Sequence, residues 1–510
     1  MDRRKFVRLR LLLVCSLGVV AAVPGIACSS SSSTPGPHVE PPADASAADV
    51  DAGNAPLLTG PVMGPGRPFT SALVDLAAAG YVEEEYFLEG DASAYDWQTP
   101  PGDDGAWSVR TTTTAHFKTR FLVRRPTDAT RFNGSVFVEW LNVSGGIDAD
   151  PDFGYAHVEL LRSGWAYVGV SAQAEGVVGG GFSLVPGQQP LVQWNPQRYG
   201  SLTHPGDDYS YDIFTQVARA VRSPGAAVHP LGALVPARFV AAGESQSAIR
   251  MVTYADAIQP VAKAFDGIFI HSRAGGAAAL SAGDAGPLAG LLGGGPPVAH
   301  IRADLGVPVF QFLTETDVLG AVGLTGFAGT RQPDTDRLRT WEVAGTSHAD
   351  QYLLDYNAAL ASEAGSPTQS CTNVNTGPQH WVEDAAVSAL QAWLKDGTPP
   401  AQADALTLSD AGDAYVKDSI GNTLGGVRTA AVDVPIAVYS GQSSSSSILC
   451  SLFGNTTALS AAQLASLYPT HDDYVGKVTA ATSEAQQAGF VVAADVPLID
   501  QEAGSAPVPQ

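Results

Sequence analysis

Residues 243–247 (GESQS) have the types and spacing of a nucleophile turn. The apolar run 237–242 precedes them, and a helical pattern follows from Ala248. A serine on a sharp strand-to-helix turn presents its hydroxyl above a sheet, and the turn requires small residues on both sides. Ser247 is small, although glycine is usual at its position. We predict that Ser245 is a nucleophile; the alternative is a loop serine that caps a helix.

A serine nucleophile needs a general base, and the base needs an orienting acid. His348 follows the apolar run 338–343 on a glycine-containing loop, and we predict that it is the base. The strand-like run 307–313 precedes Glu315 and Asp317. In this kind of site the acid lies between the serine and the histidine in chain order. We favour Asp317 because it holds the later position, and Glu315 remains the alternative.

The oxyanion formed in such a reaction needs backbone N–H donors. We predict one donor at Gln246, directly after the nucleophile. We predict the other at Val143 or Ser144, in the segment NVSGG that follows the run 135–141. The alternative for this segment is a plain turn.

Two further residues, His271 and Arg273, follow the strand-like run 265–271. We expect both to line the substrate pocket, where Arg273 could bind a carboxylate. Pairing of Arg273 with a structural acid is the alternative.

The composition limits other kinds of site. The sequence contains no H-E-x-x-H motif, paired C-x-x-C motif or closely spaced histidine pair, so we expect no metal and no cofactor. The formal net charge is −23 and no basic stripe is present, so we expect no nucleic-acid partner.

Elements that alternate along the chain must position these residues. Apolar runs typical of buried parallel strands alternate with amphipathic helical patterns such as 211–222 and 385–394. This alternation predicts an α/β fold with a mainly parallel sheet and helices on both faces. Residues 275–297 form either a cap insertion or an ordinary long loop. The strand-like runs are 117–124, 135–141, 165–171, 237–242, 265–271, 307–313 and 338–343.

The N-terminus resembles an export signal. Residues 1–28 contain a basic stretch, a short apolar run and a small-residue exit, which is the pattern of a signal peptide. Residues 2–7 resemble a twin-arginine signal, and residues 25–28 resemble a lipoprotein box that would lipidate Cys28. Ordinary cleavage near Ala27 is the alternative. We therefore expect the protein to be exported. It is then either tethered to a membrane of the cell envelope through Cys28 or free as a periplasmic or extracellular protein.

The rest of the chain divides into a linker and one domain. Residues 29–55 are rich in Ser, Pro and Ala, which predicts a disordered linker. Residues 56–505 read as one domain with insertions. Cys371 and Cys450 lie in this domain, where they form either one disulfide or two buried free thiols.

The folded part resembles a bacterial group within the α/β-hydrolase superfamily. The resemblance spans residues 60 to 500 and implies the α/β-hydrolase fold and a Ser/acid/His site. The segments that carry it are 119–126 (TRFLVRRP), 132–146 (FNGSVFVEWLNVSGG), 199–214 (YGSLTHPGDDYSYDIF), 243–248 (GESQSA), 271–273 (HSR), 314–318 (TETDV), 345–350 (GTSHAD) and 450–454 (CSLFG).

These features together predict an exported serine hydrolase that cleaves small-molecule or lipid-like carboxylic esters. One alternative is an amide hydrolase or acyl transferase that uses the same triad. Another is a surface lipoprotein that keeps the fold but only binds a ligand. The oligomeric state is left open by the sequence.

Overall fold

The computed structural model describes residues 55–508, except 182, 186, 226, 282–293, 322, 324 and 364–370. The chain divides into two compact units, residues 1–50 and 51–510, and the described residues belong to the second. The predicted signal, Cys28 and nearly all of the predicted linker lie outside the described residues, as does much of 275–297. Within the described ranges, no helix has both the length and the apolar character needed to cross a membrane.

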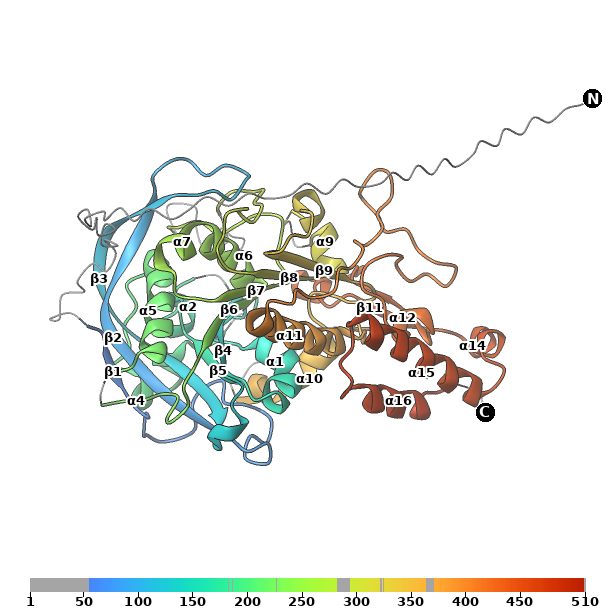
Figure 1. The fold of residues 1–510 in the computed structure, drawn as a ribbon, viewed down its shortest axis with the longest axis horizontal. Helices are drawn as coiled ribbons and strands as arrows, with labels where there is room; N and C mark the ends of the chain where they lie inside the picture. The colour runs from blue at the N-terminus through green and yellow to red at the C-terminus, as the bar shows by residue number, and fades with distance from the viewer. Residues whose placement is uncertain are drawn as a thin grey trace, which may run out of the picture. The chain divides into compact units, whose positions relative to one another are not determined.

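A nine-stranded sheet forms the centre of the described part, in the order β1-β2-β3-β5-β4-β6-β7-β8-β9 (Figure 1). In this sheet order, the neighbours from β5 through β4 to β9 pair in parallel. Strands β1, β2 and β3 extend the sheet in antiparallel pairs. The predicted mainly parallel sheet is therefore confirmed. Its strands are β1 (Leu57–Thr59), β2 (Tyr81–Trp97), β3 (Val109–Pro126), β4 (Ser135–Trp140), β5 (Ala166–Val170), β6 (Arg238–Glu244), β7 (Gly267–His271), β8 (Val309–Thr314) and β9 (Leu338–Val343).

Helices cover both faces of this sheet because both faces of its central strands are apolar. On β4, Val136 and Val138 pack in one core with the helices α5 (Ser210–Arg222) and α6 (Gln246–Thr253). Phe137 between them packs in the opposite core with α1 (Pro151–Arg162) and α11 (Gln379–Asp396). Figure 1 shows α10 beside this second pair. The remaining helices among these segments are α2 (Ala174–Val177), α3 (Leu191–Trp194), α4 (Pro196–Tyr199), α7 (Gln259–Ala262), α9 (Glu315–Leu319) and α10 (Gln351–Glu363).

The C-terminal segment adds a small two-stranded sheet and a helical layer. Tyr468, Tyr474 and Val478 form an apolar cluster there that also contains Ala503. The elements are α12 (Ala430–Asp433), β10 (Ala437–Ser440), α13 (Ile448–Ser451), β11 (Asn455–Ala458), α14 (Ala461–Leu467), α15 (His471–Ala488) and α16 (Val496–Ser505). Cys371 and Cys450 form a disulfide, which resolves the two alternatives that their positions in the sequence left open.

A buried ion-pair network ties the antiparallel strands to the helix layer. The Arg124 guanidinium on β3 is fully buried and donates to Glu83 at 2.8 Å and to Asp150 at 2.6 Å. It also lies 4.0 Å from the centre of the Phe153 ring in α1. A buried arginine needs such partners because desolvation of an isolated charge is costly.

Replacement of this arginine should destabilise the fold. In Arg124→Leu the carboxylates of Glu83 and Asp150 lose their cation inside the protein, so the free energy of unfolding should fall by about 3–5 kcal/mol. Chemical denaturation followed by circular dichroism measures this. Arg110→Leu removes the arginine of an exposed pair with Asp96 and should change stability much less. Equal stability of Arg124→Leu and the wild type would contradict the assigned role.

Candidate active site

Ser245 occupies a strained turn between β6 and α6. Its backbone has φ 60° and ψ −118°, values that residues other than glycine rarely adopt. A Cβ atom at Gly243 would lie 2.9 Å from the backbone of Ser247, so the turn requires glycine there. The Ser245 side chain does not cap α6. The structure therefore favours the nucleophile turn over the helix-capping alternative.

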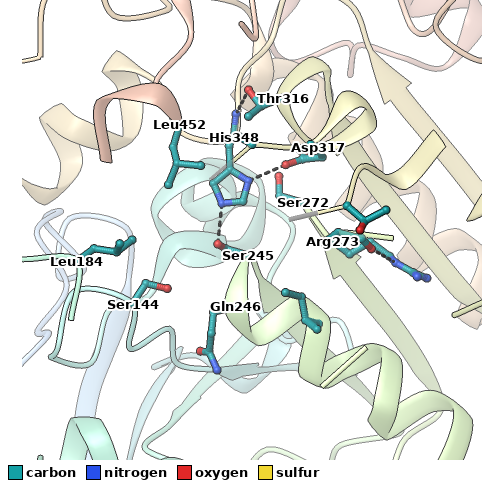
Figure 2. A pocket seen from close by; sticks show the side chains of 15 residues that line it. Ser144, Leu184, Ser245, Gln246, Ser272, Arg273, Thr316, Asp317, His348 and Leu452 are labelled. Carbon is teal, nitrogen blue, oxygen red and sulfur yellow. Dashed lines mark hydrogen bonds and ion pairs between the residues drawn. The ribbon is translucent and has the colours of Figure 1, made fainter. Parts of the chain in front are cut away.

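The Ser245 hydroxyl lies against the imidazole of His348 (Figure 2). The distance from Oγ to Nε2 is 2.6 Å, and the distance from Nδ1 of His348 to Oδ1 of Asp317 is 2.6 Å. These partners assign the proton to Nδ1, which donates to Asp317 and leaves Nε2 free to accept from Ser245. Oδ2 of Asp317 accepts from the Thr314 N–H and hydroxyl, which fixes the carboxylate.

Glu315, the alternative acid, makes contacts that indicate a structural role. Its Oε1 accepts the Gly345 N–H at 2.7 Å, and its Oε2 accepts the Gly441 N–H at 3.0 Å. Glu315 therefore holds the loop that carries His348 against the segment that follows β10. Among the described residues, the imidazole of His348 pairs with Asp317 and not with Glu315.

Glu244, which was not predicted as a site residue, adds a second carboxylate beside His348. Its Oε1 lies 3.5 Å from Nε2 of His348, and its Oε2 accepts from the Asn142 side chain at 3.2 Å. Burial raises the pKa of Glu244 to about 7, against the opposing effects of His348 and His271. The residue directly precedes the nucleophile, and this position was the only signal in the sequence that could have identified it.

The surrounding carboxylates control the protonation of His348. Burial opposes its charged form, but the charge of Asp317, the hydrogen bond to it and the charge of Glu244 outweigh burial and raise the pKa of His348 to about 9. Burial also opposes ionisation of Asp317, but the charge and hydrogen bond of His348 prevail and lower its pKa.

Two backbone N–H groups are open at the predicted oxyanion site. Gln246 is the first residue of α6, so its N–H has no partner within the helix. The Val143 N–H has no hydrogen-bond partner among the described residues, whereas the Ser144 N–H donates to the Asn142 side chain at 2.8 Å. Of the two predicted alternatives, the structure thus leaves Val143 as the candidate donor. Ser144 lines the pocket instead (Figure 2).

The pocket beside Ser245 is mostly apolar. It lies between the nucleophile turn, the loop after β4 and the loops after β7 and β8. Apolar side chains that line it include Leu184, Ile249 and Leu452. Such a surface favours an apolar acyl or alcohol group near the serine.

Arg273 lines this pocket, but its guanidinium is turned away from Ser245 (Figure 2). It is fully buried and donates to the Gln311 side chain at 2.9 Å and to the Ala299 carbonyl at 2.6 Å. The expectation that it could bind a substrate carboxylate is therefore wrong, because protein oxygens already occupy its donors.

His271, in contrast to Arg273, does not line the pocket, which corrects the expectation for this residue. It is fully buried, its Nδ1 lies 2.9 Å from Asp152, and its Nε2 lies 3.0 Å from the Gln379 amide nitrogen. The strand end carries the His271 side chain away from the pocket, toward α1 and α11.

Several solved structures resemble the chain. XC6422 from Xanthomonas campestris, described as an a/b serine hydrolase without lid, is 13% identical with a TM-score of 0.26, over 55% of this chain and 97% of its own. A glucuronoyl esterase from Solibacter usitatus is 10% identical with a TM-score of 0.26, over 61% and 89%. An esterase from Rhizomucor miehei is 15% identical with a TM-score of 0.25, over 57% and 91%. No curated relative matches the sequence.

The family of the chain follows from a longer match. A family model described as an alpha/beta hydrolase domain matches residues 42–500, which is most of the sequence. The resemblance to this superfamily and the predicted fold are both confirmed. The chain belongs to the alpha/beta hydrolase domain family.

Proposed function

We propose that this protein hydrolyses carboxylic esters, with Ser245 as nucleophile. The observation that carries the proposal is the continuous chain of contacts from Ser245 through His348 to Asp317, at 2.6 Å in both steps. A hydroxyl is a weak nucleophile unless a base takes its proton, and this arrangement supplies the base and its orienting acid.

Each residue has one role in the proposed reaction. Ser245 attacks the ester carbonyl while Nε2 of His348 takes the hydroxyl proton. The N–H groups of Gln246 and Val143 stabilise the oxyanion, and His348 then passes the proton to the departing alcohol. Water, activated by the same imidazole, releases the acid and restores Ser245. Asp317 keeps the imidazole in the required tautomer throughout.

The lining of the pocket favours an ester with an apolar part as the substrate. The apolar residues Leu184, Ile249 and Leu452 favour an apolar or lipid-like acyl or alcohol part. A parallel panel of amide substrates and acceptor alcohols distinguishes this activity from that of an amidase or acyl transferase with the same triad.

The first prediction from the proposed activity concerns the nucleophile. Wild type should hydrolyse p-nitrophenyl esters, and Ser245→Ala should lose about 10⁴-fold or more in kcat, because the variant lacks the hydroxyl that His348 activates. The matched control Ser163→Ala, beyond the end of α1, should keep its activity. Equal rates for Ser245→Ala and wild type would show that Ser245 is not the nucleophile. An inactive wild type would contradict ester hydrolysis.

The second prediction separates the two acids. Asp317→Asn should lower kcat by about 10⁴-fold, because an amide cannot hold the imidazole in the productive tautomer. Glu315→Gln should lower the melting temperature, because one of the two side-chain oxygens that accept from the Gly345 and Gly441 N–H groups is lost, and should change kcat far less. The reverse pattern of kcat values would assign the acid to Glu315.

The third prediction concerns pH. The base must be neutral, and the pKa of His348 is raised to about 9. The kcat/KM value should therefore rise about tenfold per pH unit below that value and level off above it. Glu244→Gln removes one of the charges that raise this pKa, so the inflection should move to lower pH. Glu89→Gln, which removes a half-buried carboxylate of β2 that pairs with Lys118, should leave it in place. An inflection that moves upward in Glu244→Gln would contradict the assignment.

A further inference from the structure

A second cluster of ligating side chains lies behind the nucleophile turn. Asp152 in the first turn of α1, His271 at the end of β7 and Glu383 in α11 meet there, and each side chain is fully buried. Nδ1 of His271 lies 2.9 Å from Oδ1 of Asp152 and 3.6 Å from Oε1 of Glu383. One ligand atom from each residue falls within 4.8 Å of the others.

Several oxygens in this cluster have no hydrogen-bond partner among the described residues. They are Oδ2 of Asp152 and both carboxylate oxygens of Glu383. Buried polar atoms of this kind are rare in folded proteins, and each one requires a physical explanation. A carboxylate with both oxygens unpartnered inside a protein is also one of the most costly groups to bury.

The cluster has no cation to balance these carboxylates. Among the described residues, no lysine or arginine forms an ion pair with Asp152 or Glu383. The nearby Arg162 pairs with Glu159, Asp384 and Asp495 instead. Within the part of the chain that the structure describes, only His271 is a basic group that contacts both carboxylates.

The Gln379 side chain permits a histidine tautomer suited to a metal. Its amide nitrogen lies 3.0 Å from Nε2 of His271, while its Oε1 has no partner among the described residues. A half-turn of the Gln379 side-chain amide exchanges the positions of its oxygen and its nitrogen. Oε1 of Gln379 would then accept a hydrogen bond from the Nε2–H group of His271, and Nδ1 would present its lone pair to the space between Asp152 and Glu383. Metal-bound histidines are commonly held by such a second hydrogen bond.

We propose that Asp152, His271 and Glu383 bind a divalent transition-metal ion of the Zn²⁺ class. Zinc takes imidazole nitrogen and carboxylate oxygen at about 2.0–2.2 Å, which in a tetrahedron places ligand atoms about 3.4 Å apart. The separations of 2.9 and 3.6 Å require only small adjustments to reach this geometry. A second oxygen of Asp152 or Glu383 can complete the coordination.

The proposed ion would be structural. All three ligands are inaccessible to solvent, so the site is closed to substrate. The ion would join α1, β7 and α11, and the His271 carbonyl accepts the Ser245 N–H at 3.0 Å. It would therefore support the strand end against which the nucleophile turn rests. The proposal does not depend on ester hydrolysis, since it concerns metal binding alone.

The test is the metal content and stability of the purified protein. Protein produced with ZnCl₂ in the medium and passed through a desalting column should retain about one zinc ion per chain by inductively coupled plasma mass spectrometry. Its melting temperature should lie at least about 2 °C above that of protein produced with a zinc chelator. The buried location predicts loading during folding, so zinc is supplied during synthesis.

Two carboxylate variants on the same helix make the test specific. Glu383→Gln should lose the bound zinc and the zinc-dependent rise in melting temperature. The matched control Asp384→Asn removes a neighbouring buried carboxylate that faces Arg162, and it should retain both. Wild type that holds no zinc, or as much as Glu383→Gln, would overturn the proposal. Protons shared among the carboxyl groups would then be what neutralises the cluster.

Discussion

Ser245 has a left-handed backbone conformation that the surrounding structure must enforce, and the site geometry depends on this constraint. Strand β6 fixes one side of the turn and α6 fixes the other, while the close approach of Gly243 and Ser247 leaves no room for larger residues. The turn directs the hydroxyl toward His348 and leaves the Gln246 N–H free at the start of the helix. One local constraint thus positions both the proposed nucleophile and a proposed oxyanion donor.

The parallel sheet brings the other groups to the same edge. Asp317 follows β8 and His348 follows β9, and the carboxyl ends of parallel strands lie side by side. Because the side chains at this edge are buried, the protonation state of each one depends on the charges beside it. Asp317 and Glu244 stabilise the imidazolium from two sides, and Glu315 holds the His348 loop by accepting from the Gly345 N–H. Carboxylates at the ends of several strands therefore set the protonation state of the His348 imidazole.

Much of this arrangement could be predicted because it is local in sequence. The seven strand-like runs correspond to β3 to β9, since buried parallel strands are continuously apolar. Strand β2 was not predicted, because its sequence includes charged and small polar residues such as Glu83, Glu84 and Asp91. The orientations of His271 and Arg273 depend on packing against distant helices and loops. The cluster of Asp152, His271 and Glu383 joins three segments far apart in the chain, so no spacing rule could identify it.

The central claim is that Ser245 is activated by His348, and covalent labelling tests it most directly. The protein is treated with a fluorophosphonate, and the modified peptide is identified by mass spectrometry in wild type and in His348→Ala. We expect a single phosphonate adduct on Ser245 in wild type, and labelling that is at least about a hundredfold slower in His348→Ala. An adduct on a different serine, or equal labelling rates in the two proteins, would contradict the claim.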